Sequence, residues 1–308
     1  MKINQREFSN ETDKRAMAAL VRDFPANNLH VVDLPYRLSS WAFDFPENIG
    51  LWVNADGQLL AWAVMQTPFG TIDYAYHPNA GKSLHQLILA WANERACRIA
   101  ATPSGRNCWF VNVFGSLTER IRELEEMGFA SQANVGRDSW SKVFMQNSAQ
   151  IPVGNHNLPD GFSIRPLAGE NEVDACVQLH RAVFQTKNMT IEWRKRTLRH
   201  PEYISDIDLV AVAPDGRLAA FCACWLDKNS EIPSGQVEPL GVHQDFRRLG
   251  LGRAILSEGL RRLYRLGARQ TFVETDNYRN AAFHLYESTG FRVTYDVLVY
   301  RKDYDNQN

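Results

Sequence analysis

The second half of the chain repeats the first, and this internal repeat restricts the possible folds more than any other feature. Three short segments recur in the same order, each about 160 residues further along the chain. The matched pairs are Asp56–Trp62 (DGQLLAW) with Asp215–Phe221 (DGRLAAF), Leu84–Leu89 (LHQLIL) with Leu251–Leu256 (LGRAIL), and Met127–Phe129 (MGF) with Thr289–Phe291 (TGF). The alternative is a chance similarity of short apolar segments, which three matches in one order disfavour. The sequence therefore predicts one fold that occurs twice.

The boundary between the two copies is predicted in a polar segment near the middle of the chain. Residues 146–161 are rich in Asn, Gly and Pro, which is typical of a linker. A length of 308 residues fits two domains of about 150 residues each. Apolar residues make up 44% and charged residues 22%, so each half has enough apolar material for a core. We therefore predict domains at 1–147 and 161–308, joined by a linker at 148–160.

The fold class follows from the order of helices and strands in the second half. Apolar residues at helical spacing predict helices at 170–184 and 190–200, and the pair Asp215-Gly216 predicts a hairpin. The further elements expected are a strand at 235–242, a helix from Leu249 with Gly267 as its C-cap, a strand at 269–275, a helix at 280–288 and a strand at 292–300. This order predicts an α/β (α+β) fold, with a mixed, mostly antiparallel sheet flanked by helices and one parallel crossover.

The segment from Val242 to Ala254 (VHQDFRRLGLGRA) is the most informative for function, because it joins a strand to a helix through Arg and Gly residues. Backbone N–H groups in the first turn of a helix have no partner within the helix, and the helix dipole is positive there. Gly250 and Gly252 let an anion reach that backbone, while three nearby Arg side chains add positive charge. These features favour a pyrophosphate site. The alternative is a flexible turn whose Arg side chains face solvent.

Other nucleotide motifs, a membrane location and a nucleic-acid partner are disfavoured. The dinucleotide fingerprint needs Gly or Ala where Ile255 stands, and the Walker A motif needs Gly where Tyr76 stands. A net charge of −1 is unlike that of a dedicated nucleic-acid binder. No apolar run approaches the ~20 residues that span a bilayer, and the N-terminal residues lack a signal-peptide core. Five cysteines give neither a disulfide framework nor a Cys-x-x-Cys pair. We therefore expect a cytoplasmic protein without a metal, a membrane partner or a nucleic-acid partner.

Two motifs of the second half match a known family. Residues 247–252 (RRLGLG), at a strand-to-helix junction, resemble the (Gln/Arg)-x-x-Gly-x-(Gly/Ala) motif of the GCN5-related N-acetyltransferase (GNAT) family. Further along the chain, residues 282–291 (AFHLYESTGF) resemble the second signature of that family. The resemblance covers residues 161–304 and, more faintly, the first half. It implies a tandem of two acyl-CoA N-acyltransferase (GNAT) folds.

The resemblance also implies acyl transfer from acetyl-CoA, a co-substrate, to an amine. The loop at 247–253 would hold the CoA pyrophosphate, and the strands at 236–242 and 269–275 would separate to admit the pantetheine. The implied acetyl-CoA-binding residues are Leu240, Gly241, Val242, Arg247, Arg248, Leu249, Gly250, Leu251, Gly252, Arg253 and Arg279. At the position of Arg279 the family often has Asn, so the usual contact with the pantetheine is in question and an arginine could contact a CoA phosphate instead.

Direct transfer to an amine requires a base that takes a proton from the amine and an acid that protonates the departing thiolate. Tyr286 falls where many family members have a tyrosine near the thioester sulfur, and its ordinary pKa of ~10 suits an acid. Glu238, on the strand before the loop, is the implied base. The alternatives are a packed core role for Tyr286 and a solvent-exposed edge position for Glu238, which the neighbouring Pro239 favours. His243 is a weaker candidate for the base.

The first half lacks the residues that carry this resemblance. The aligned pairs are Ala80 with Arg247, Ser83 with Gly250, His85 with Gly252 and Leu124 with Tyr286. All four features are absent together, so we predict a degenerate GNAT-like domain with a structural role, such as closing the acceptor pocket or orienting the other domain. Residues 77–82 could still bind an anion at a helix start.

The leading hypothesis is an acetyl-CoA-dependent N-acetyltransferase whose C-terminal domain acetylates the amine of a small molecule or an amino terminus. The alternatives are a non-catalytic acyl-CoA-binding regulatory module and a structural protein with a relic loop. The resemblance implies that residues 185–201 and 292–300 select the acceptor. Met189, Trp193 and Tyr203 in or near these segments suggest an apolar wall, and neither the acceptor nor the oligomeric state is predicted.

Overall fold

The chain forms two compact units, and each contains segments from both halves of the sequence. The computed structural model describes residues 2–103, 105–133, 141–148, 154, 157–276 and 280–304. Unit 1 comprises residues 1–31, 40–142 and 295–308, and unit 2 comprises residues 32–39 and 143–294. A short segment of the N-terminal half therefore belongs to unit 2, and the C-terminal segment belongs to unit 1.

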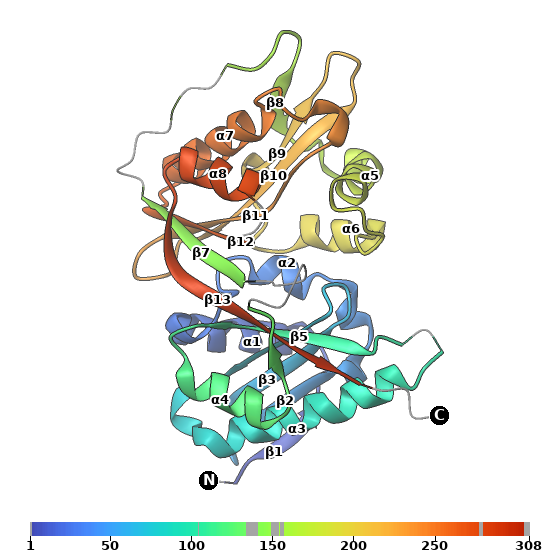
Figure 1. The fold of residues 1–308 in the computed structure, drawn as a ribbon, viewed down its shortest axis with the longest axis vertical. Coiled ribbons are helices and arrows are strands. Elements are labelled where there is room, and N and C mark those ends of the chain that lie inside the picture. The colour runs from blue at the N-terminus through green and yellow to red at the C-terminus, as the bar shows by residue number, and fades with distance from the viewer. Residues whose placement is uncertain are drawn as a thin grey trace. The chain divides into compact units, whose positions relative to one another are not determined.

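Unit 1 is a mixed sheet flanked by helices (Figure 1). Its strands are β1 (Asn4–Glu7), β2 (Ile49–Val53), β3 (Leu59–Gln66), β4 (Thr71–Tyr76), β5 (Cys108–Phe114), β6 (Ala130–Ser131) and most of β13 (Arg292–Asp303). Its helices are α1 (Glu11–Asp23), α3 (Gly81–Ala100) and α4 (Thr118–Glu126), with short 3-10 turns η1 (Pro25–Asn27), η2 (Trp41–Asp44), η3 (Pro46–Asn48) and η4 (Pro78–Ala80). The strand order is β1-β2-β3-β4-β5-β13, and all neighbours are antiparallel except β4 and β5.

Unit 2 has the same kind of sheet, with its own set of helices (Figure 1). Its strands are β7 (Ser141–Ser148), β8 (Ser163–Pro166), β9 (Asp208–Val212), β10 (Leu218–Asp227), β11 (Ser234–Val242) and β12 (Gln270–Asp276). Its helices are α2 (Leu34–Leu38), α5 (Val173–Phe184), α6 (Ile191–Arg199), α7 (Leu251–Arg265) and α8 (Asn280–Ser288), with 3-10 turns η6 (Gly169–Glu172), η7 (Ser205–Ile207) and η8 (Gln244–Phe246). The strand order is β7-β12-β11-β10-β9-β8, with β11 parallel to β12.

Helices α5 and α7 cover opposite faces of the unit 2 sheet, and β10 lies between them (Figure 1). Successive side chains of a strand point to opposite faces. Cys222 and Cys224 face α7, where the sulfur atoms come within 3.2 and 3.0 Å of the place that a Cβ on Gly259 would take. Phe221 points the other way and packs in a cluster with Leu179 of α5. The two cysteines are buried in the core.

Most element positions match the prediction from the sequence, and the differences have local causes. The Asp-Gly hairpins are confirmed, because Gly57 and Gly216 have φ of +81° and +84° in the turns between antiparallel strands. The first residues of the helix predicted at 170–184 form the 3-10 turn η6 instead. Strand β7 continues through Ser148, into the start of the polar segment that the sequence assigned to a linker. The predicted domain boundaries remain a prediction.

Candidate active site

The loop between β11 and α7 exposes backbone N–H groups at the start of a helix. His243 Nδ1 accepts a hydrogen bond from the backbone of Asp245 (3.3 Å) and so caps the short turn η8. Arg248 and Gly250 then adopt left-handed φ values of +66° and +80°. Ala254 donates the first bond of the helical ladder, to the Gly250 carbonyl (3.1 Å), so the N–H groups just before it have no helical partner. This arrangement forms a cradle that suits an anion.

Three arginines belong to the loop and the first turn of α7. Arg247, Arg248 and Arg253 are exposed, as are Leu249 and Gly250. The arginines further along α7 have a different environment, because Arg262 Nε donates to Glu258 (2.6 Å). The cationic groups at the helix start are therefore distinct from those of a salt-bridged, solvated helix face.

Strands β11 and β12 pair only at their beginnings. The parallel register covers Ser234 to Gln236 on β11 and Gln270 to Phe272 on β12. From Val237 to its end at Val242, β11 does not pair with β12 in the described part of the chain. The predicted residues Leu240, Gly241 and Val242 lie on this unpaired part, next to the cradle.

Gly252 leaves room between β11 and α8. A Cβ at this position would lie 3.4 Å from both Val242 Cγ2 on β11 and Leu285 Cδ2 on α8. A larger side chain would extend into the space between these elements. Without a Cβ, the backbone at this position is not covered by a side chain of its own.

Glu238 lies at a β-bulge in β11. Cys222 on β10 pairs with Leu240, and Cys224 pairs with Val237, so Ala223 faces two residues of β11 instead of one. The Glu238 carbonyl accepts a hydrogen bond from the indole of Trp225 (2.9 Å), and the residue is half-buried. A bulge of this kind re-aims the side chains beside it, which here include the predicted base.

Tyr286 is buried on α8, with its ring edge-to-face against Phe291 at 5.6 Å between centroids. Burial raises the pKa of the Tyr286 hydroxyl well above its usual range, and the nearby Glu238 carboxylate adds to this rise. The phenol therefore stays protonated at neutral pH, as an acid requires. The two groups proposed as acid and base therefore interact electrostatically within unit 2.

The sequence also predicted roles for His243, as a weaker candidate base, and for Arg279, as a contact to acetyl-CoA. His243 caps the loop through Nδ1, which gives it a structural task at the cradle. Arg279 lies outside the described residues.

Among the residues that the structure describes, no cluster of three or more His, Cys, Asp and Glu side chains could hold a metal ion. In the same residues no helix is long and apolar enough to cross a membrane.

Unit 1 has a counterpart of α7 without the cradle. The buried residues Leu84, Ile88 and Leu89 of α3 follow the same pattern as Leu251, Ile255 and Leu256 of α7, in agreement with the repeat alignment. His77 caps η4 as His243 caps η8. However, α3 begins at Gly81, so Ser83, the counterpart of Gly250, lies inside the helix.

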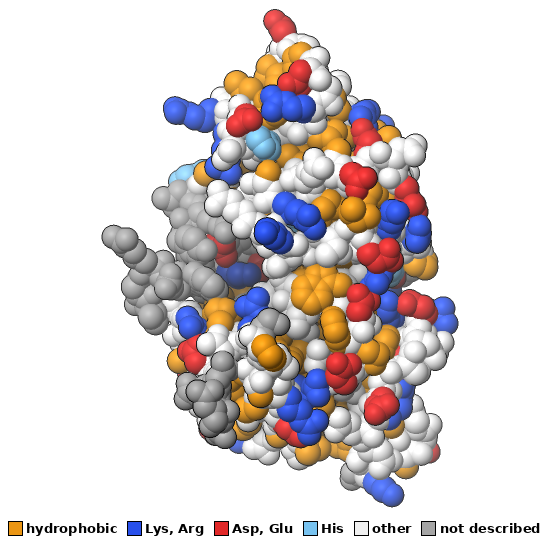
Figure 2. All heavy atoms as spheres, turned by 90° about the vertical axis from the view of Figure 1, so that its right-hand side faces the viewer, with side chains coloured by type: hydrophobic (Ala, Val, Ile, Leu, Met, Phe, Trp, Pro, Cys, Tyr) orange, Lys and Arg blue, Asp and Glu red, His pale blue; other side chains and the backbone are white. Residues whose placement is uncertain are grey.

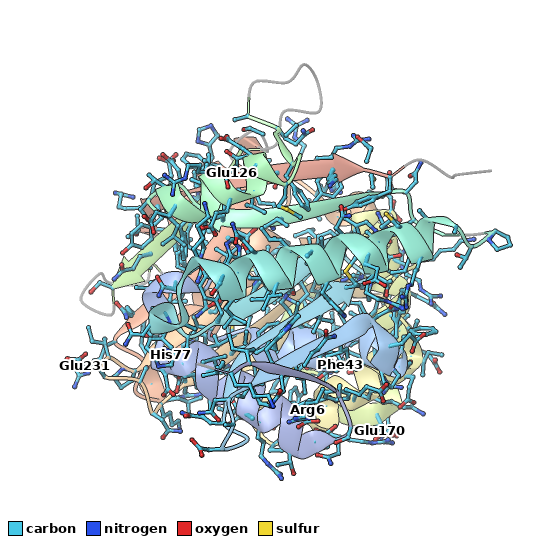
Figure 3. All side chains as sticks on the ribbon, turned by 90° about the horizontal axis from the view of Figure 1, so that it is seen from below. Arg6, Phe43, His77, Glu126, Glu170 and Glu231 are labelled. Carbon is cyan, nitrogen blue, oxygen red and sulfur yellow. The ribbon has the colours of Figure 1, made fainter. Side chains whose placement is uncertain are left out.

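His85 stands in unit 1 at the position that the repeat alignment pairs with Gly252 of unit 2. His85 is fully buried, with Nδ1 bonded to Glu123 of α4 and Nε2 to the Tyr74 hydroxyl of β4 (3.0 Å). Arg120 donates to the Tyr76 hydroxyl (3.0 Å), and its guanidinium lies over that ring. Figure 3 shows α3 crossing the strands of unit 1 beside α4.

Charges are balanced locally on the face of the molecule that carries α5 and α6. Figure 2 shows acidic and basic side chains interspersed on this face, with no large field of one sign among the described residues. Arg199 contacts Glu170 at 2.8 Å, and Arg196 contacts Glu192 at 3.2 Å. These two arginines are therefore each paired with a neighbouring carboxylate.

A family model described as the acetyltransferase (GNAT) family matches residues 174–291. These residues belong to the GNAT family. Mycothiol acetyltransferases from Kineococcus radiotolerans and Thermobispora bispora are 35% and 29% identical over 147 and 167 residues, which are 46% and 51% of this chain and 46% and 56% of theirs. The chain thus spans about half the length of the curated relatives that it matches.

Solved structures confirm the predicted fold across both halves of the chain. A GCN5-related N-acetyltransferase from Sphaerobacter thermophilus superimposes with a TM-score of 0.66 at 20% identity, covering 98% of this chain and 95% of that one. A tandem GNAT protein from the clavulanic acid biosynthesis pathway superimposes with a TM-score of 0.67 at 12% identity, covering all of both chains. At these identities the likeness shows the fold, which is a tandem of two GNAT folds.

Sequence reasoning missed the contribution of α2 to unit 2. Tyr36 is buried, its carbonyl accepts a hydrogen bond from the Trp193 indole (3.2 Å), and the two rings lie 5.1 Å apart. Of the side chains expected to form an apolar wall, Met189 and Trp193 are buried, whereas Tyr203 donates to Asp208 (2.7 Å). No local signal marks α2, because five residues carry too little periodicity to reveal which core they join.

Proposed function

We propose that this chain is an acetyl-CoA-dependent N-acetyltransferase and that unit 2 carries the activity. The product would be the acetylated amine of a small molecule or an amino terminus. One observation carries this proposal: the part of the chain that matches the GNAT family also contains the open cradle, whereas unit 1 has His85 in the corresponding place. The curated relatives are mycothiol acetyltransferases, so an acceptor of the mycothiol class belongs among the amines tested.

The cradle residues would bind and orient acetyl-CoA. The N–H groups that precede Ala254 would donate to the pyrophosphate, with Arg247, Arg248 and Arg253 supplying positive charge. Leu240 to Val242 and Gly252 would contact the pantetheine, and Arg279 would contact a phosphate. The bound thioester supplies the activated acetyl group.

Glu238 and Tyr286 would manage the two protons of the transfer. The amine nitrogen forms a bond to the acetyl carbon, and the carbon–sulfur bond breaks. Glu238 would take the proton that the amine loses, and Tyr286 would give a proton to the departing sulfur. The half-buried position of Glu238 at the bulge and the protonated state of Tyr286 support this division of roles.

The test is release of the CoA thiol from acetyl-CoA in the presence of a panel of primary amines. We expect Glu238→Gln and Tyr286→Phe each to lower kcat by about 100-fold or more, the usual range for loss of an acid or base. Tyr300→Phe is the matched control, because this tyrosine lies in unit 1 and donates to Glu125 (2.9 Å). Unchanged turnover in both site variants would contradict the assigned roles. Thermal stabilisation by CoA without thiol release for any amine would favour the non-catalytic binding module instead.

A further inference from the structure

A small cavity lies on the face of the unit 2 sheet that α5 and α6 cover. Its volume is about 20 Å³, which is room for a group the size of one water molecule. The walls include Tyr36 of α2, His180 of α5, Met189, Arg194 of α6, Phe221 of β10 and Pro239 of β11. Cys176 and Asp208 also line the cavity and both interact with Arg194, and the other lining side chains are mostly apolar.

The cavity adjoins the predicted base. Pro239 lines it and directly follows Glu238 in the bulge of β11. Tyr36, which also lines the cavity, is buried, and the Glu238 carboxylate contributes to the raised pKa of its hydroxyl. For a substrate whose amine reaches Glu238, the cavity is therefore a neighbouring site for one of its other groups.

Two buried nitrogen atoms of the cavity residues have no hydrogen-bond partner within the described part of the chain. They are His180 Nδ1 and Arg194 Nε, both shielded from solvent. The rest of the Arg194 guanidinium is held in place, because Nη2 bonds to Asp208, and this carboxylate also accepts from the Tyr203 hydroxyl. Buried polar atoms rarely remain unpaired in native proteins, and each unpaired one is costly.

The chemistry of these two atoms is complementary. The Arg194 N–H can only donate. Burial lowers the pKa of His180 to about 4, so its imidazole is neutral at neutral pH and one ring nitrogen can accept a hydrogen bond. The ring is oriented by stacking on Phe221, at 5.8 Å between centroids. In the tautomer that carries its proton on Nε2, His180 Nδ1 accepts, so a group that fits would accept one hydrogen bond from Arg194, donate one to His180 and be no larger than the cavity.

A hydroxyl group meets these three conditions. A methyl group of the same size would leave both nitrogen atoms unpaired, and an ammonium group could not accept from Arg194. We propose that this cavity is a specificity subsite for a hydroxyl group on the amine acceptor, bound between His180 Nδ1 and Arg194 Nε. The proposal rests on the proposed acetyl transfer and narrows its substrate class to hydroxylated amines.

The first experiment compares acceptors that differ only in this group. The pairs are L-serinamide with L-2-aminobutanamide and 2-aminoethanol with propylamine, in which a hydroxyl replaces a methyl. We expect kcat/KM to favour the hydroxylated member by about tenfold, as for one hydrogen-bonded pair of buried groups. His180→Phe should bring the ratio close to one. His180→Asn, which keeps a polar atom near the position of Nδ1, should restore part of it. His284→Phe, at an exposed histidine, is the control and should leave the ratio unchanged.

A second measurement tests the subsite without turnover. In the ¹⁵N-histidine-labelled protein with CoA, the hydroxylated amine should shift the Nδ1 resonance of His180, which is assigned by its loss in His180→Phe. The matched methyl analogue should not shift it. Turnover without a preference for hydroxylated amines would overturn the subsite and leave the proposed function standing. Absence of turnover with every amine would overturn the proposed function, and the resonance shift alone would then decide the subsite.

Discussion

Gly252 offers the sharpest test of why one unit is proposed to bind CoA and the other not. Its counterpart in unit 1 is His85, so Gly252→His places in unit 2 the side chain that stands at the aligned position in unit 1. The position sits in the first turn of α7, and its missing Cβ points between Val242 and Leu285. The substitution therefore changes the space proposed for CoA and leaves the sequences of strands β11 and β12 unchanged.

The size of the effect follows from the distances. A Cβ would be 3.4 Å from Val242 Cγ2 and from Leu285 Cδ2, close to van der Waals contact, so Gly252→Ala fits with small adjustments. Because Ala is the better helix former, we expect this variant to gain about 0.5–1 kcal/mol in free energy of unfolding. An imidazole extends beyond the Cβ into the space itself. We expect Gly252→His to weaken CoA binding at least about 100-fold, or about 2.7 kcal/mol.

Isothermal titration with CoA measures the affinity, and chemical denaturation measures the stability. Arg261→His is the matched control, since it adds a histidine to the exposed side of the same helix. The control should bind CoA as the parent protein does. If Gly252→His kept the parent affinity while folding normally, the ligand would not pass this glycine, and the comparison of the two units would lose its basis. A loss of stability in Gly252→Ala would show that the space is narrower than the structure indicates.

Further predictions concern stability. Asp208→Asn should cost about 3–5 kcal/mol in denaturation experiments, because it leaves a buried arginine unpaired, whereas Glu94→Gln at an exposed ion pair should cost less than about 1 kcal/mol. Burial lowers the pKa of His180 from 6.5 to about 4. The buried neutral imidazole therefore makes the free energy of unfolding fall as the pH drops from 6.5 toward 4, whereas above pH 6.5 it has no such effect. In His180→Phe, this pH-dependent fall should be smaller by up to about 3 kcal/mol. Gly259→Leu should destabilise by about 1–3 kcal/mol through overpacking, and Cys224→Ala, which removes the sulfur 3.0 Å away, should recover part of it in the thermal melting point.

The features that sequence reasoning located are those encoded by neighbouring residues. Hairpin turns at Asp-Gly pairs, the strand-to-helix loop with Gly250 and the buried stripe of α7 each depend on a few consecutive positions. The repeat alignment of the two helices also agrees with their buried positions, because helical periodicity carries its own register. Together, the turns, the loop and the helical periodicity were enough to predict the family and the fold.

The remaining features depend on segments far apart in the chain. Glu238 was a candidate by type and position, but its place in a bulge depends on how β10 pairs with β11. The bond between His85 and Glu123 requires two helices to meet, and no pattern within either helix indicates it. Tyr36 joins unit 2 through a helix of five residues. Short edge strands such as β8 are missed because four residues hold too little periodicity to identify a strand.

The exchange of segments between the halves bears on how such a gene can evolve. Once residues 32–39 of the N-terminal half complete unit 2, and residues 295–308 of the C-terminal half complete unit 1, neither copy can be deleted alone. Loss of the first copy would remove Tyr36 from Trp193, and loss of the second would leave β5 with an unpaired edge where β13 now lies. Each copy therefore supplies a segment that the other unit needs, whether or not its own half binds a ligand. This mutual dependence gives a structural reason for both copies of the fold to persist.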